Sequence, residues 1–338
     1  MADENSAEGG RLIGGQFRAQ GAMDSFLGYQ YVECIDETNS SSVGIRLVSR
    51  GDLERLGAAL RMQKDVKRAG SLVHKNIARV MGFGKDGGDL FVVEESVVGY
   101  RLSHLLNRRR ESGRPFGLKE AFYLTIHFCN ALGHATDSLP HGLLAPSHIV
   151  MRKDGRPKVI GFGLAALLPG IVNDVSLLDW DQVCLTDHLQ SPAQRDLYAL
   201  GRIFYALLKN GVDTERSFAE QVEVDDALTP GMIRLLLRCA GDGDVKPLAG
   251  PSEFREELHN VVSEMFQTLG DEPKRTASTG PPPMPSELDD SVVAKPMGMD
   301  LIAQGHRNEA SEEMSELRWM YRLQDQEFGP VSGQQLVA

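Results

Sequence analysis

Short β-rich runs, in which apolar residues are concentrated, dominate the chain from residue 16 to about residue 97. They are rich in β-branched and aromatic residues and are separated by Gly, Asn and Asp, which favour turns. The runs are QFRAQ, YQYVECID, SVGIRLV, IARVMGF and DLFVVEE. One stretch with helical periodicity lies among them, from Asp52 to Arg68. The pattern predicts a small sheet accompanied by one helix.

Helical periodicity takes over from Leu102 onward. In the segments Leu118 to Asp137 and Asp196 to Leu208, apolar residues recur every three or four positions and therefore share one face of a helix. A strand-rich region followed by a helical region is typical of an α+β fold with segregated elements. Alternating βαβ units are not expected.

The periodic pattern ends near residue 267. Residues 268–315 are rich in Pro, Gly, Ser and acidic side chains and hold few large apolar ones, so we expect a disordered linker there. We also expect residues 1–11 to be disordered. Aromatic and turn-forming residues return in residues 316–338, which we expect to form a separate small module.

Composition narrows the class of protein. Of the 338 residues, 41% are hydrophobic and 25% are charged, as is typical of a soluble globular protein. The net charge of −11 disfavours binding to nucleic acids or acidic membranes, because such binding needs clustered Lys and Arg. Neither a signal peptide nor a sufficiently long apolar run is found, so we expect no membrane span and a cytoplasmic location. The four cysteines are too scattered for a zinc site, and no metal site is expected.

Two segments in the middle of the chain have the outline of catalytic motifs. HGLLAPSHIV begins at His141 and KVIGFGLA begins at Lys158, yet neither has a carboxylate where chemistry would need one. Together with IGGQFR, VHKNIARVMGFG, VVGYRL and RDLYALGRIFYALL, they resemble the bacterial Ser/Thr protein kinases in order and spacing. The resemblance implies a bilobal protein kinase-like fold over residues 12–267, with a β-rich N-lobe to about residue 97 and a helical C-lobe from about residue 98.

In that family, phosphoryl transfer needs a glycine-rich loop, a lysine paired with a glutamate, and metal-binding and catalytic carboxylates. Aligned with this chain, the loop glycines fall on Asp24, Phe26 and Tyr29. Two aromatic side chains would block the approach of a phosphate to the backbone, and Asp24 would repel it. The lysine position holds Arg46 and the glutamate position holds Asp65.

The catalytic-loop positions have also changed. The catalytic Asp, the following Lys and the metal-binding Asn are replaced by Leu143, Ala145 and His148, and the Asp of the metal motif is replaced by Gly161. Leu143 accepts no proton, Gly161 offers no metal ligand, and imidazole suits Mg²⁺ poorly. We therefore expect no catalytic residues, and we expect ATP and magnesium binding to be lost or very weak.

Residues with a structural role in the family are retained at His141, Phe162, Gly163 and Asp196. His141 is a candidate general base by its chemistry. The resemblance implies instead that it packs behind Phe162, while Asp196 holds the loop backbone.

Two substitutions predict how the nucleotide pocket is filled. Tyr31 takes the position of a small valine above the adenine ring, and Gly44 takes that of an alanine, so we expect the Tyr31 ring to lie in the vacated slot, largely buried between the lobes. Glu94 falls at the back of the pocket and needs a cationic partner if buried. An ion pair of Arg46 with Glu94 or with Asp65 is predicted.

The C-terminal segment WMYRLQDQEFGPVS resembles the first half of a bacterial GYF-type module. The resemblance implies that it binds proline-rich segments. A short hairpin or an amphipathic tail is the alternative interpretation. The residues of this candidate peptide site are Trp319, Tyr321, Phe328, Gly329 and Pro330.

These observations support one leading hypothesis and two alternatives. The leading one is a catalytically inactive kinase-like domain that acts as a signalling scaffold or regulator, with an active kinase or a proline-rich segment as candidate protein partners. The first alternative is an unconventional or weak ATP-dependent Ser/Thr kinase. The second is an adaptor that binds proline-rich peptides through the terminal module.

Overall fold

The computed structural model describes residues 10–136, 138–172, 177–186, 188–189, 191–209, 211, 213–241, 245–270, 318–323 and 326–332. The chain divides into two compact units, Met1–Leu269 and Gly270–Ala338. The segments predicted to be disordered lie largely outside the described residues, so those two expectations stay predictions.

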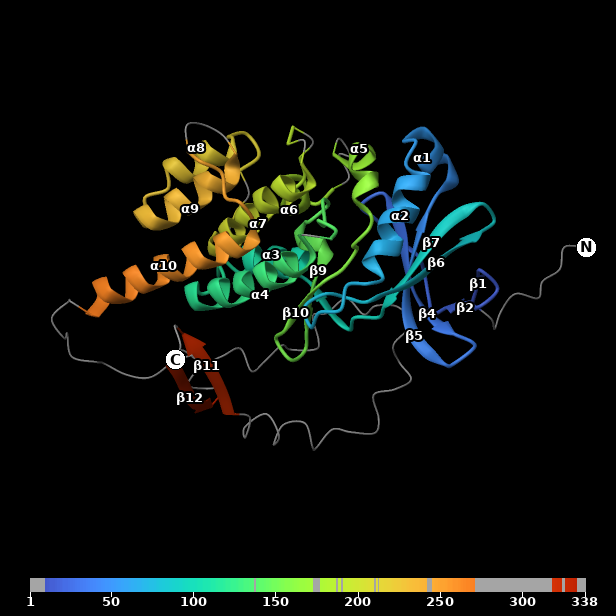
Figure 1. The fold of residues 1–338 in the computed structure, drawn as a ribbon, viewed down its shortest axis with the longest axis horizontal. Coiled ribbons are helices and arrows are strands. Elements are labelled where there is room, and N and C mark those ends of the chain that lie inside the picture. The colour runs from blue at the N-terminus through green and yellow to red at the C-terminus, as the bar shows by residue number, and fades with distance from the viewer. Residues whose placement is uncertain are drawn as a thin grey trace, which may run out of the picture. The chain divides into compact units, whose positions relative to one another are not determined.

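The first unit begins with a seven-stranded antiparallel sheet, blue to cyan in Figure 1. The strand order is β1-β2-β4-β5-β7-β6, and β3 pairs with β4. Every predicted β-rich run overlaps one of these strands, and two runs coincide with β4 and β7. The strands are β1 (Leu12–Ile13), β2 (Phe17–Ala19), β3 (Asp24–Phe26), β4 (Tyr29–Asp36), β5 (Ser41–Val48), β6 (Val80–Asp86) and β7 (Asp89–Glu95).

The sheet buries apolar side chains on both faces. Phe91 packs edge-on against Phe17, with ring centroids 5.8 Å apart, in a cluster on one face. Its neighbours on β7, Leu90 and Val92, belong to the other cluster, which includes Met62. Successive side chains of a strand point to opposite faces, so a strand buried on both faces has a nearly continuous apolar run. This accounts for the sequence of β7.

The prediction of one helix from Asp52 to Arg68 is wrong in one respect, because two helices occupy this stretch. Helix α1 spans Arg50–Arg55 and helix α2 spans Ala59–Ala69. Gly57 lies between them with a φ of +59°, in the left-handed region that ends a right-handed helix. The single glycine therefore separates the two helices.

The helical lobe follows the sheet (Figure 1). Helix α4 spans Leu118–Thr136 and confirms the helix predicted there. Helix α7 begins four residues earlier than predicted, at Pro192, because proline suits the first turn of a helix. The lobe consists of β8 (Gly99–Arg101), α3 (Leu102–Glu111), α4, η1 (Pro146–His148), β9 (Ile149–Arg152), β10 (Pro157–Val159), η2 (Ala165–Leu167), α5 (Leu168–Ile171), α6 (Asp179–Gln182), α7 (Pro192–Leu208), α8 (Phe218–Glu223), α9 (Pro230–Ala240) and α10 (Pro251–Gly270).

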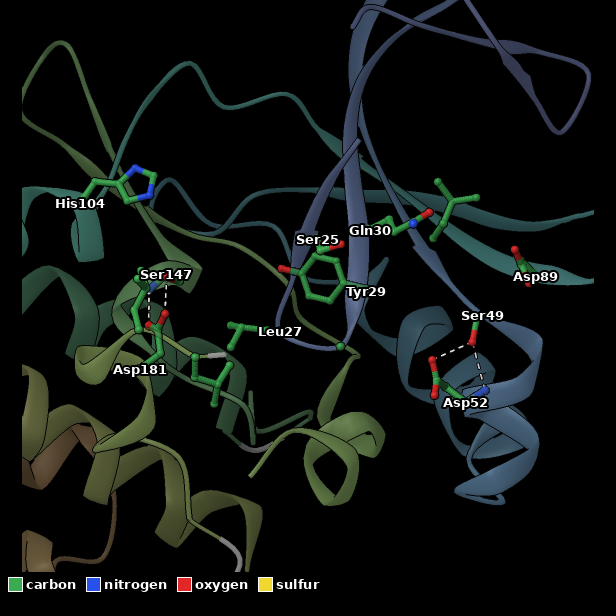
Figure 2. Close-up of a pocket in the computed structure, with 14 residues that line it drawn as sticks. Ser25, Leu27, Tyr29, Gln30, Ser49, Asp52, Asp89, His104, Ser147 and Asp181 are labelled. Carbon is green, nitrogen blue, oxygen red and sulfur yellow. Dashed lines mark hydrogen bonds between the residues drawn. The ribbon is translucent and has the colours of Figure 1, made fainter. Parts of the chain in front are cut away.

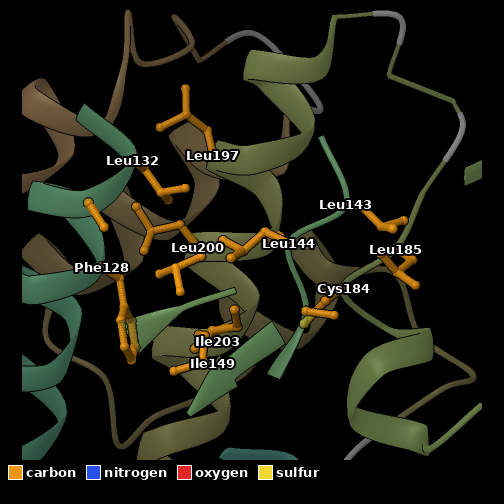
Figure 3. Close-up of a cluster of buried hydrophobic side chains, with 14 of the residues drawn as sticks. Phe128, Leu132, Leu143, Leu144, Ile149, Cys184, Leu185, Leu197, Leu200 and Ile203 are labelled. Carbon is orange, nitrogen blue, oxygen red and sulfur yellow. The ribbon is translucent and has the colours of Figure 1, made fainter. Parts of the chain in front are cut away.

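Helices α4 and α7 form the centre of this lobe. Phe128 and Leu132 of α4 lie opposite Leu200 and Ile203 of α7, and Leu144 enters the same cluster from the loop that follows α4 (Figure 3). All five side chains are at most 2% exposed. Burial of a leucine or phenylalanine stabilises a fold by roughly 1.5–3 kcal/mol, so this cluster is a rigid base for the loop.

A buried carboxylate fixes that loop to α7. The two oxygens of Asp196 accept the backbone N–H groups of His141 and Gly142, each at 2.7 Å. Burial raises the pKa of Asp196 to about 7, although both N–H donors oppose the rise. Asp196 therefore holds the loop backbone, as the resemblance implies.

The second unit is a two-stranded antiparallel hairpin of β11 (Arg318–Leu323) and β12 (Gln326–Ser332). Trp319 pairs with Val331, and Tyr321 pairs with Phe328. Gly329 and Pro330 lie in β12. Both the GYF-like module and a simple hairpin would place paired strands here, so the peptide-binding site stays a prediction.

Among the residues that the structure describes, no helix is both long and apolar enough to cross a membrane. Helix α4 is long, but its sequence includes Lys119, Glu120 and two histidines. The apolar residues of the long helices are used instead to form the core of the helical lobe.

We expect Asp196→Ala to lower the free energy of unfolding by about 2–4 kcal/mol, because two buried N–H groups lose their acceptor. Asp213 is a matched control, since it also accepts two backbone N–H groups, from Glu215 and Arg216, but its side chain is 39% exposed. Water replaces the lost acceptor there, so Asp213→Ala should cost much less. Urea unfolding of both variants measures the difference, and equal losses would contradict the role given to Asp196.

Candidate functional site

Several predicted residues of the nucleotide pocket lie where the sheet faces the loops at residues 141–148 and 160–163. Arg46 on β5 and Glu94 on β7 form an ion pair, and each is 1% exposed. The Arg46–Glu94 alternative is thereby confirmed. Asp65 on α2 lies instead 3.8 Å from Arg61 and 3.9 Å from Arg68, its neighbours on the same helix.

Glu94 also connects the sheet to the loop that holds the altered metal motif. One of its carboxylate oxygens pairs with Arg46, and the other accepts the backbone N–H of Gly161 at 2.8 Å. A buried carboxylate is tolerated only when both oxygens are satisfied. The same side chain therefore fills the back of the cleft and joins the two lobes.

Tyr31 lies beside Gly44, as predicted. A Cβ on Gly44 would come within 2.8 Å of the Tyr31 hydroxyl and 2.9 Å of its ring, so only glycine leaves room for it. The guanidinium groups of Arg46 and Arg101 each lie 5.3 Å from the ring centroid. The ring is half-buried, less than predicted, and its hydroxyl donates to Glu33. Burial, followed by the charge of Glu33, raises the pKa of Tyr31.

Tyr29 makes a contact that the sequence did not reveal. Its hydroxyl lies 3.0 Å from Nε2 of His148, and its side chain is 4% exposed. Nδ1 of His148 lies 2.7 Å from the carbonyl oxygen of Leu143, so Nδ1 must carry the proton and Nε2 accepts from Tyr29. This bond joins residues 119 positions apart, across the two lobes. The only sequence signal is that both positions depart from the family pattern.

The residues aligned with the loop glycines form a tight hairpin instead of a loop. Asp24 pairs with Tyr31 and Phe26 pairs with Tyr29, so only Leu27 and Gly28 make the turn between β3 and β4. Both turn residues have positive φ values, +39° and +78°. Such a turn matches the twist of the two strands.

His141 is buried and has the structural role that the resemblance implies. Its Nε2 donates to the carbonyl oxygen of Ile160 at 2.9 Å, and its Nδ1 accepts the N–H of Leu143 at 3.2 Å. Its ring packs edge-on against Phe162, with centroids 4.7 Å apart. Burial lowers the pKa of His141 to about 4. Both ring nitrogens are engaged by the backbone, which makes His141 unsuitable as a general base.

Two glycines of the altered metal motif fit against large neighbours. Gly161 has a φ of +83°, and a Cβ there would lie 2.8 Å from the ring of His148. A Cβ on Gly163 would lie 2.8 Å from the Cα of Val66 in α2. The His148 ring thus occupies the space that a carboxylate at position 161 would need. Leu143 and Ala145 are buried in the core, at most 1% exposed.

A cavity of about 600 Å³ remains beneath the hairpin (Figure 2). Among the described residues that line it, the charged ones are acidic and none is Lys or Arg. A phosphate would therefore meet repulsion there. The cavity is lined by Ser25, Leu27, Gly28, Tyr29, Gln30, Leu47, Ser49, Asp52, Asp89, His104, Ser147, Leu177, Leu178 and Asp181.

Asp181 is a buried carboxyl group that sequence reasoning missed. It accepts the N–H of Ser147 at 2.9 Å and its hydroxyl at 2.5 Å, and burial raises the pKa of Asp181 to about 6. Both oxygens are engaged by Ser147, so the carboxyl group fixes η1 to α6. Among the described residues, no cluster of three or more His, Cys, Asp or Glu could hold a metal ion.

Comparisons with known proteins identify the fold. No family model matches the chain. A probable serine/threonine-protein kinase PknB of Lactococcus lactis is 26% identical over 181 residues, which are 49% of this chain and 28% of the relative. A probable serine/threonine-protein kinase pknA2 of Bifidobacterium longum is 24% identical over 220 residues, 61% of this chain and 28% of the relative.

The crystal structure of the PknI kinase domain of Mycobacterium tuberculosis is similar, with a TM-score of 0.59 and 17% identity. The match covers 76% of this chain and 100% of that domain. The chain therefore has the protein kinase fold, an α+β fold, and this confirms the predicted fold class. It matches little more than a quarter of the length of these two curated relatives.

We expect Arg46→Met to lower the free energy of unfolding by about 3 kcal/mol or more, because Glu94 would be left buried without its cation. Combining it with Glu94→Gln should recover most of the loss, since the amide oxygen still accepts the Gly161 N–H. The control is Arg18→Met, which breaks the exposed pair with Glu37 and should change little. Calorimetry on the four proteins tests this; a small effect of Arg46→Met would refute the buried pair.

The buried ring of His148 predicts that the free energy of unfolding depends on pH. Burial keeps the pKa of His148 well below 6.5, and the neutral ring is the form that accepts from Tyr29. The unfolded chain then binds more protons, so stability is lost as the pH falls below 6.5. Asp181 and Asp196, whose pKa values are raised, act in the opposite direction, so the test must be a difference between variants.

Between pH 6.5 and pH 5, wild type should lose more unfolding free energy than His148→Asn, by up to about 1.4 kcal/mol per pH unit. Asparagine stays neutral throughout this range. Urea unfolding at several pH values gives the two slopes. Parallel slopes would mean that His148 is protonated in the folded protein.

Proposed function

We propose that this chain is a catalytically inactive domain with the protein kinase fold, which acts as a scaffold or regulator through contacts with other proteins. The observation that carries the proposal is the set of interactions across the cleft. Arg46, Glu94 and the Gly161 N–H fill its back, while Tyr29 and His148 join the two lobes. A nucleotide would have to displace a buried ion pair and a buried hydrogen bond.

Three features of the cleft oppose the binding of a nucleotide. The ring of Tyr31 occupies the space beside Gly44, where the resemblance places adenine. The cavity beneath the hairpin is acidic and unfavourable to phosphates. A metal ligand at position 161 is excluded sterically by His148. The proposal therefore includes no ATP or magnesium as a cofactor.

The residues that remain from the family pattern are those that hold the backbone together. Asp196 fixes the loop at residues 141–142, His141 bonds Ile160, and Gly163 allows α2 to approach closely. A domain that keeps these contacts without a catalytic carboxylate retains a folded surface for partners. An active kinase and a proline-rich segment are the partner classes that we propose, in the cytoplasm.

A weak ATP-dependent Ser/Thr kinase is the competing function, favoured by the names of the two curated relatives. Its chemistry would need a proton acceptor and a metal site. Groups that act together in catalysis fail together, so restoring one of them adds little. The two functions differ in whether the protein binds nucleotide with magnesium and transfers phosphate.

We expect no incorporation of labelled phosphate from ATP above background by wild type, Leu143→Asp, Gly161→Asp or the double variant. Restored carboxylates cannot act on a nucleotide that is not held in line. Purified protein with magnesium or manganese is incubated with labelled ATP, and nucleotide binding is measured by calorimetry. Magnesium-dependent binding and phosphate transfer by wild type, lost in Asp65→Asn, would refute the proposal and favour the weak kinase.

The same variants test the geometry independently of activity. Gly161→Asp should lower the melting temperature, and adding His148→Asn should restore part of the loss by removing the ring that it meets. Gly155→Asp is the matched control, because Gly155 has a φ of +74° and no atom within 4 Å of its Cβ position. Equal losses for Gly155→Asp and Gly161→Asp would mean that backbone strain, and not the His148 ring, opposes the restored carboxylate.

A further inference from the structure

The turn between β3 and β4 is the part of the sheet lobe that reaches α5. A Cβ on Gly28 would lie 2.9 Å from Cγ1 of Ile171. Leu27 and Ile171 are 5% and 1% exposed and belong to one apolar cluster. Figure 2 shows Leu27 at this turn, close to Tyr29. The backbone of Gly28 in this turn therefore lies directly against the Ile171 side chain of α5, and Leu27 beside it is buried in the same core.

In this position of the turn, the backbone of Leu27 is strained. Leu27 has a φ of +39°, in a region that residues with a side chain rarely adopt. The cost of that backbone conformation and the gain from burying a leucine are of the same order. Strain persists only where the surroundings compensate for it, and here the surroundings include α5. The turn is thus stable in this position only while the apolar residues around it, Ile171 of α5 among them, stay in place.

Helix α5 depends in turn on the sheet lobe. It has only four residues, too few to be stable alone. Its Ile171 contacts Gly28, and a Cβ on Gly170 would lie 3.3 Å from Cδ1 of Leu56. In Figure 1, α5 lies beside α1 and α2. Both of these contacts of α5 come from the N-terminal lobe.

We propose that the Leu27–Gly28 turn is a latch that holds α5 in place and couples it to the cleft. Tyr29 directly follows the turn and bonds His148, so a change that breaks this bond shifts the turn as well. Release of the turn frees α5 and the adjoining η2 while the rest of the helical lobe stays folded. This device goes beyond the proposed function and does not require it, since a weak kinase could contain it too.

Hydrogen exchange measured by mass spectrometry tests the latch. Gly28→Ala, which introduces the Cβ that meets Ile171, should speed amide exchange in residues 165–172 by tenfold or more and leave α4 unchanged. Gly15→Ala is the matched control, because Gly15 also has a positive φ, +71°, but no atom within 4 Å of its Cβ position. The control should leave residues 165–172 as in wild type.

Two further variants separate local release from general unfolding. Leu27→Asn introduces a residue that tolerates the left-handed conformation but removes the buried apolar side chain, and it should free residues 165–172 to a similar extent. Ile171→Ala should speed exchange in residues 24–31, because coupling is reciprocal. Unchanged exchange in both segments, or faster exchange throughout α4 in all three variants, would overturn the latch.

Discussion

The buried ion pair of Arg46 and Glu94 constrains the rest of the cleft. Two charges at 1% exposure cannot exist singly, because removing one leaves the other without solvation. Glu94 uses its remaining oxygen for the Gly161 N–H, so satisfying one charge also determines the position of the loop in the other lobe. The requirement that buried polar groups be satisfied thus turns a substrate cleft into a contact between two lobes.

Around this pair, small and large residues complement each other. Tyr31 fits because Gly44 has no side chain, and His148 fits because Gly161 has none. If Tyr31 or His148 were replaced by the smaller residue usual in the kinase family, the glycine beside it would leave a void. The altered positions are therefore dependent on one another, and close packing makes a single reversion sterically unfavourable.

The fold survives these changes because its stability depends on other contacts. Asp196 supplies acceptors to two buried N–H groups, and the α4–α7 cluster forms a rigid base beneath them. Neither contribution needs a nucleotide or a metal. The turn that holds the strained Leu27 meets the short helix α5 through Gly28 and Ile171, which makes this junction less secure than the helical core.

Local sequence patterns determined much of this protein. Runs of β-branched and aromatic residues between turn residues predicted the strands of the sheet, and helical periodicity predicted α4. Motif spacing predicted the fold class, the position of Tyr31 and two alternative ion pairs of Arg46, of which the pair with Glu94 forms. These features depend on side-chain period and on chemistry at aligned positions. The prediction failed where one glycine divided a helix, because its positive φ is a property of the folded chain.

Only the tertiary structure decided the contacts across the cleft. Tyr29 and His148 are 119 residues apart, and Ser147 and Asp181 are 34 apart. Such pairs leave no periodic signal, because they depend on how two lobes and their loops come together in space. The sequence could therefore indicate which catalytic groups are missing, but the identity of the side chains that occupy their place followed from packing and from the need to satisfy buried polar atoms.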